Sequence, residues 1–218
     1  MRFLTSKYCE FALGARTFIH SGRRGRSATG SDLSIGISLE TVVPEAPLEQ
    51  NDAGLYPAGE GWFVVNARDT QWFDSNGLGF YAPFEGENAG FAQLGFNIGI
   101  LRPGEPSCMY HHEDAQEDFL VLSGECVLIV EGEERPLKAW DFVHCPAWTG
   151  HVFVGAGDGP CLLLGAGARI PGRGLVYPVD EAARRHGAGV EKETSQGAEA
   201  YASFGRPWPT PCPEEFPG

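Results

Sequence analysis

From residue 93 to residue 165, short apolar runs alternate with turn residues, and this alternation restricts the chain to a fold of many short strands. The runs are rich in aliphatic and β-branched side chains, and their spacing of about 8–12 residues is typical of an all-β sandwich or barrel. The 30 glycines and 16 prolines among 218 residues supply the turns that such a fold needs. The expected strands cover residues 93–101, 117–122, 126–131, 134–137, 141–145, 151–154 and 161–165.

The residues before this region are expected to add little regular structure. Residues 62–67 (WFVVNA) are aromatic and β-branched, so they predict a first strand. Residues 68–90 hold many glycine, asparagine and aspartate residues with aromatic residues among them. They predict a long structured loop with one strand near residues 78–82.

The residues after the region change character again. Residues 178–187 (PVDEAARRHG) predict a short helix that Asp180 caps and Gly187 ends. Beyond Thr194 the sequence is polar and then rich in proline, which predicts an irregular tail.

The first 40 residues differ in charge from the rest, with six basic and three acidic residues in a chain of net charge −13. An arginine cluster follows the short apolar piece of this segment instead of preceding it, which is unlike a secretory signal. We interpret residues 1–40 as a flexible or poorly ordered N-terminal arm, or as a leader translated from an over-early start codon. Residues 41–175 are expected to form the barrel with an N-terminal extension, and residues 176–218 the short helix and irregular tail.

Charge and cysteine content exclude several classes of partner. A net charge of −13 opposes binding to nucleic acid and to anionic membrane surfaces. No run reaches the roughly 18 apolar residues of a membrane-spanning helix. The six cysteines form no CxxC pair, which favours reduced thiols in a cytoplasmic protein.

A candidate metal site follows from the alternation of side chains along strands. Residues two apart share a face, so Tyr110 and His112 point to one side and His111 to the other. Glu117 and His151 lie on later strands. If His112, Glu117 and His151 line one barrel interior, two imidazoles and one carboxylate meet there. That donor set suits non-haem Fe(II), and Mn, Ni or Zn can occupy the same ligands, so we predict one divalent metal ion with iron favoured.

The spacing of these residues resembles the first motif of the cupin superfamily. That motif has a glycine, five residues, His-X-His, three or four residues, a glutamate, six residues and a glycine. This chain has, in the same order and with matching spacing, Gly104, then Tyr110-His111-His112, Glu117 and Gly124. Tyr110 stands where the first histidine of the motif belongs.

The second cupin motif is similar to residues 146–151 (PAWTGH), in which Trp148 replaces a glycine; Gly155 stands where asparagine is usual. The two motifs cover about 50 residues, and the flanking strands extend the resemblance to roughly residues 60–170. The resemblance implies a double-stranded β-helix, also called a jelly-roll barrel. Cupins usually pair through their sheets, so it also implies a homodimer.

Because Tyr110 departs from the motif, three arrangements of the site remain open. In the first, His112, Glu117 and His151 bind the ion alone, with Tyr110 as a weak fourth ligand or a nearby acid. In the second, a local bulge turns His111 inward as well or instead. In the third, the site has lost its metal and binds a ligand through the remaining polar groups.

The resemblance implies a metal-dependent enzyme that acts on a small organic molecule, with Fe(II)-type oxygenase chemistry favoured. Tyr110 or His111 would then be the acid or base beside the metal ligands. The alternatives are a sugar isomerase or epimerase, a non-catalytic barrel that binds a sugar or another metabolite, and a purely structural barrel. His144 has no motif position and is interpreted as structural or as part of a pocket wall.

Overall fold

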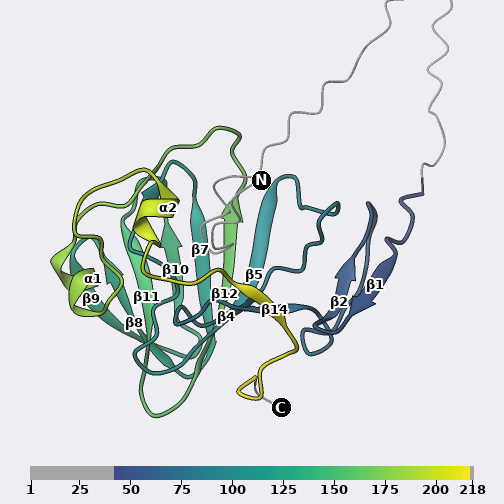
Figure 1. Ribbon diagram of the computed structural model, residues 1–218, viewed down its shortest axis with the longest axis horizontal. Helices are drawn as coiled ribbons and strands as arrows, with labels where there is room; N and C mark the ends of the chain where they lie inside the picture. The colour runs from purple at the N-terminus through teal and green to yellow at the C-terminus, as the bar shows by residue number, and fades with distance from the viewer. Residues whose placement is uncertain (1–41, 217–218) are drawn as a thin grey trace, which may run out of the picture.

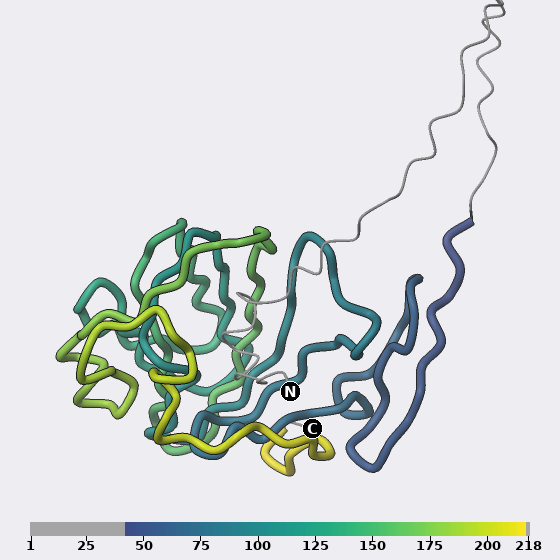
Figure 2. Tube along the Cα trace, turned by 45° about the horizontal axis from the view of Figure 1, so that its top comes forward, coloured from purple at the N-terminus to yellow at the C-terminus, as the bar shows by residue number. Residues whose placement is uncertain are grey.

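The computed structural model describes residues 42–216, so the predictions for residues 1–40 lie outside the described residues (Figures 1 and 2). The described chain is all-β, as predicted, and each of the seven strands expected between residues 93 and 165 is present. The elements are β1 (Leu48–Asn51), β2 (Gly54–Pro57), β3 (Trp72–Asp74), β4 (Phe80–Ala82), β5 (Leu94–Leu101), β6 (His112–Glu113), β7 (Glu117–Ser123), β8 (Glu125–Val130), β9 (Glu133–Lys138), β10 (Phe142–Cys145), β11 (His151–Ala156), β12 (Cys161–Ala168), β13 (Leu175–Val176), α1 (Glu181–Arg185), α2 (Gly197–Ala200) and β14 (Trp208–Thr210).

Two antiparallel sheets enclose the main core. The larger has seven strands in the order β10-β7-β12-β5-β4-β3-β14, and the smaller has three in the order β11-β8-β9. Side chains from both sheets meet in one buried cluster, because every second residue of a strand points to the same face. This is the double-stranded β-helix arrangement that the sequence predicted. The cluster comprises Leu101, Val121, Cys126, Leu128, Phe153, Cys161 and Leu163.

The two helices cover the outer face of the three-stranded sheet (Figure 1). The buried Ala182 and Ala183 of α1 belong to the same cluster as Ile129 of β8 and Val152 of β11. The predicted cap of α1 is present, because the Asp180 carboxylate accepts a hydrogen bond from the backbone N–H of Ala183 at 2.8 Å. Neither helix in residues 42–216 has the length and apolar character needed to cross a bilayer.

The prediction of a strand at residues 62–67 is wrong. Trp62 forms only an isolated bridge with Glu45, and Val64 is 80% exposed. Aromatic and β-branched residues favour a strand only where a neighbouring strand gives them a surface to pack on, and this segment has none over its length.

The tail is also less irregular than predicted. Residues 197–200 form α2, and residues 208–210 form β14, which pairs antiparallel with β3 at the edge of the large sheet. Pro209 has no N–H to donate, so the edge position suits this strand. Ala200 of α2 packs into the cluster that holds Ile129 and Val152, and β14 pairs with β3, so both segments contact distant parts of the chain that tail composition does not indicate.

Candidate metal centre

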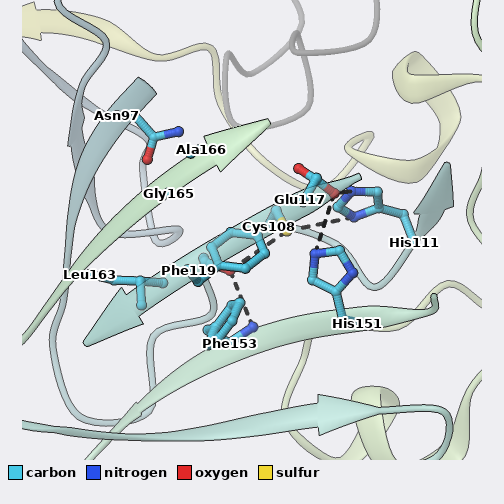
Figure 3. Close-up of a pocket in the computed structure, with 11 residues that line it drawn as sticks. Asn97, Cys108, His111, Glu117, Phe119, His151, Phe153, Leu163, Gly165 and Ala166 are labelled. Atoms are coloured by element: carbon cyan, nitrogen blue, oxygen red, sulfur yellow. Dashed lines mark hydrogen bonds and ion pairs between the residues drawn. The ribbon is translucent and has the colours of Figure 1, made fainter. Parts of the chain in front are cut away.

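Three buried donor groups from separate parts of the barrel converge inside it (Figure 3). His111 lies just before β6, Glu117 begins β7 and His151 begins β11. Nε2 of His151 lies 3.4 Å from Oε2 of Glu117, and Nε2 of His111 lies 3.8 Å from the same oxygen. One ligand atom from each residue lies within 4.8 Å of the other two. The three side chains therefore face a common point.

Backbone carbonyls hold both imidazoles in the tautomer that binds a metal. Nδ1 of His111 donates to the carbonyl oxygen of Met109 at 2.9 Å, and Nδ1 of His151 donates to that of Thr149 at 3.0 Å. A carbonyl only accepts, so the proton lies on Nδ1 and the lone pair of Nε2 faces the cavity. Such outer contacts are the usual way in which proteins orient metal-binding histidines.

Burial makes these three groups costly without a cation. His111 and His151 are each 3% exposed and Glu117 is 6% exposed. Oε2 of Glu117 has no hydrogen-bond partner among the residues that the structure describes. A buried carboxylate that lacks a donor loses the free energy of its hydration, and a bound cation restores it. The donor set of two imidazoles and one carboxylate therefore fits a divalent metal ion, as predicted in kind.

Burial also determines at which of the three groups a proton competes with the metal ion near neutral pH. It lowers the pKa of His111 to about 3, and it lowers the pKa of His151. It raises the pKa of Glu117 to about 7, with Arg173 acting in the opposite direction. Near neutral pH the imidazoles are therefore ready to bind an ion, whereas Glu117 must lose its proton.

We expect metal affinity to fall about tenfold for each pH unit below 7, because one proton then competes with the ion for Glu117. Titration of the metal-free protein with Co²⁺ between pH 5.5 and 7.5, followed by absorbance, measures this slope. In the metal-free protein, Glu117 contributes unfolding free energy that is lost as pH rises from 4.5 to about 7, whereas His111, with its pKa lowered to about 3, contributes a change in the opposite direction below pH 6.5. An affinity that stays constant over this range contradicts the assignment of Glu117.

The expected position of His112 is not the observed one, because the register differs by one residue. His112 is half-buried outside the cluster, and its ring meets that of Trp148 at a centroid distance of 5.4 Å. His111 instead bridges to His151. The N–H of Ser107 bonds to the carbonyl of Phe153, so the first segment advances four residues while the partner strand advances two. The two additional residues leave the alternation of faces unchanged, and the bridge to His151 places His111 on the cavity side.

Tyr110, which was expected beside the metal ligands, and His144, which was interpreted as structural or as part of a pocket wall, both lie outside the cavity lining. Tyr110 is 5% exposed and packs with Ile129 and Val152 on the far side of the small sheet, away from the cavity lining. Burial raises the pKa of its hydroxyl to about 12, so it is poorly suited to donate or accept a proton near neutral pH. His144 is half-exposed and its Nδ1 lies 2.6 Å from Asp118 Oδ1, outside the cavity.

A buried ion pair lies beside the site, and the sequence did not indicate it. The side chains of Arg173 and Glu113 are 0% and 2% exposed and are in direct contact. The burial of Glu113 follows from the same register, because Glu113 shares a face with His111. Burial and the nearby Glu117 raise the pKa of Glu113, whereas the charge of Arg173 and its hydrogen bond lower it.

The three donors open into a small cavity between the two sheets (Figure 3). The cavity has a volume of about 20 Å³. This leaves room for an ion and a small group, and a ring-sized molecule needs a wall residue to move. The lining also comprises Asn97, Ser107, Cys108, Phe119, Phe153, Leu163, Gly165 and Ala166.

Comparison with known proteins agrees with this geometry. Residues 97–166 match the family model described as the cupin domain. The chain contains a cupin domain. The match begins in β5 and ends in β12, so it includes all three donor residues of the cluster. The recognition made from the two sequence motifs is confirmed.

Two curated relatives match parts of this cupin protein. Gentisate 1,2 dioxygenase 1 of Aquipseudomonas alcaligenes is 26% identical over 107 residues, which is 49% of this chain and 30% of the relative. The 5-nitrosalicylic acid 1,2-dioxygenase of Bradyrhizobium sp is 34% identical over 64 residues, which is 29% of this chain and 30% of the relative. The matches thus span less than a third of either relative.

Solved structures also resemble parts of the chain. A cupin superfamily sugar phosphate isomerase from Silicibacter pomeroyi is 27% identical, with a TM-score of 0.40, over 53% of this chain and 74% of that one. A polyketide cyclase from Streptomyces resistomycificus is 15% identical, with a TM-score of 0.40, over 45% of this chain and 71% of that one.

Proposed function

We propose that this cupin protein is a metal-dependent enzyme, and that it acts on a small organic molecule as an Fe(II)-type oxygenase. His111, Glu117 and His151 are the proposed ligands of one divalent ion. The observation that carries the proposal is their buried convergence on one point, with Oε2 of Glu117 lacking a hydrogen-bond partner among the described residues. Three protein ligands on one side of an ion leave other positions open for a substrate.

The part of each residue in this proposal follows from its surroundings. The bound ion would supply a redox-active Lewis acid with open coordination positions. Met109 and Thr149 hold the two imidazoles through their carbonyl oxygens, so the ligand geometry is set before any substrate enters. Phe119, Phe153 and Leu163 restrict water, which strengthens the electrostatic effect of charged groups inside the cavity.

The two curated relatives support oxygenase chemistry and suggest the first substrates to test. Their names place gentisate and 5-nitrosalicylic acid among the substrates of such enzymes, and both are hydroxylated aromatic acids. We propose this class for the present chain. None of the described residues that line the cavity is lysine or arginine, an arrangement poorly suited to the phosphate of a sugar phosphate.

Oxygen consumption tests the proposal. The Fe²⁺-loaded protein should consume O₂ only when a suitable hydroxylated aromatic acid is present, and His151→Ala should reduce the rate by at least about 100-fold through loss of a ligand. His144→Ala is the matched control, since His144 lies outside the cavity lining and should leave the rate unchanged. Substrate binding without O₂ consumption would support a binding protein instead.

A further inference from the structure

Asn97 faces the cavity from β5, across from the three metal-binding side chains (Figure 3). It is 6% exposed. Asn97 pairs with Gly165 on β12, and Gly165 pairs in turn with Phe119 on β7, so the three residues form one row across the sheet. A methyl group on Gly165 would lie 3.3 Å from Oδ1 of Asn97 and 3.4 Å from the Phe119 ring. The missing side chain therefore leaves an open strip between the amide and the ring.

The side-chain amide of Asn97 faces the cavity without a hydrogen-bond partner among the described residues. Within residues 42–216, no side chain or backbone group forms a hydrogen bond with it. Ser107 and the two histidines of the lining do have protein partners: Ser107 Oγ accepts from the N–H of Phe153 at 3.3 Å, and both imidazoles donate to carbonyls. An amide that faces a cavity without a protein partner is available to a ligand that enters the cavity.

We propose that Asn97 determines substrate specificity by hydrogen-bonding a neutral polar substituent of the substrate. This inference rests on the proposed function, in which the ion binds the other end of the same molecule. The amide carries both donors and an acceptor, so it suits a hydroxyl or a carbonyl group. Because the described lining has no lysine or arginine, an anionic group is stabilised only beside the ion.

The walls between these two ends restrict the middle of the substrate. Phe119 and Phe153 lie with ring centroids 4.6 Å apart, and Leu163 adds a third apolar surface. A flat apolar centre packs best against such walls. The class of substrate is thus a planar acid with its acidic end at the metal and a hydroxyl or carbonyl across the ring. Phe119 is only partly buried, and its rotation is the movement that would admit a ring.

A pair of probes that differ by one hydroxyl tests the role of Asn97. The probes are 2-hydroxybenzoate and 2,5-dihydroxybenzoate, titrated calorimetrically into the Co²⁺-loaded protein without turnover. The wild-type protein should bind the dihydroxy probe about tenfold more tightly, through the additional hydrogen bond. Asn97→Leu should bind both probes equally while it keeps its metal content. A preference that survives in Asn97→Leu, or equal or undetectable binding of both probes by the wild-type protein, overturns the proposal.

Gly165→Ala provides a second variant, should Asn97→Leu not fold. Its methyl group enters the strip between Asn97 and Phe119 and should weaken binding of the dihydroxy probe about tenfold, with unchanged metal content. Unchanged affinity in this variant counts against the proposal.

The two proposals fail in different ways. Selectivity that depends on Asn97 without O₂ consumption refutes the oxygenase and leaves the specificity role intact. O₂ consumption with unaltered selectivity in Asn97→Leu refutes the specificity role alone.

Discussion

Replacing His111 with alanine should abolish metal binding, whereas the same change at His112 should leave the metal in place. His111 directs Nε2 toward Glu117 and His151 from a buried position, and His112 lies outside this cluster against Trp148. The His111→Ala variant keeps only two of the three protein ligands, which is too few to hold the ion tightly. Metal analysis of protein loaded with Fe²⁺ or Co²⁺ should give about one equivalent for wild type and His112→Ala, and less than about a tenth for His111→Ala.

Each variant is the control for the other, because both replace a histidine side chain with a methyl group at adjacent positions of the same segment. Circular dichroism should show that both variants keep the fold. Loss of metal from His112→Ala with retention in His111→Ala would mean that the strand register near β6 is the one that the motif spacing first suggested.

The second large effect concerns the buried ion pair between Arg173 and Glu113. Changing Arg173 to methionine leaves a carboxylate almost fully buried without its cationic partner. Removal of one member of a buried pair costs about 3–5 kcal/mol of unfolding free energy. The midpoint and slope of urea denaturation, followed by fluorescence, give this free energy.

Two further variants identify the cause of that loss. The double variant Glu113→Gln/Arg173→Met removes both charges and should recover part of the lost stability. Arg135→Met removes an exposed ion pair with Glu133, whose side chains are 62% and 66% exposed, and should cost less than about 1 kcal/mol. Similar losses in Arg173→Met and Arg135→Met would show that burial of the pair contributes no additional stability.

Local patterns in the sequence were sufficient to predict the barrel and part of its site. Apolar runs between glycine and proline turns predicted strands β5 and β7 to β12, because both strand length and turn chemistry depend on neighbouring residues. Alternation along those strands also indicated that Glu117 and His151 point inward, and the structure brings the two together.

Contacts between distant segments decided the remainder. The bridge between His111 and His151 selected His111 over His112, and this register depends on hydrogen bonds between residues 40 or more positions apart. Arg173 meets Glu113 across 60 positions, and Asn97 faces the cavity only because β5 lies beside β12. The sequence by itself therefore determined which residue types and strands were present. The tertiary structure alone decided which side chains share the cavity, because side-chain direction reverses with a shift of one residue and only the paired strand sets that shift.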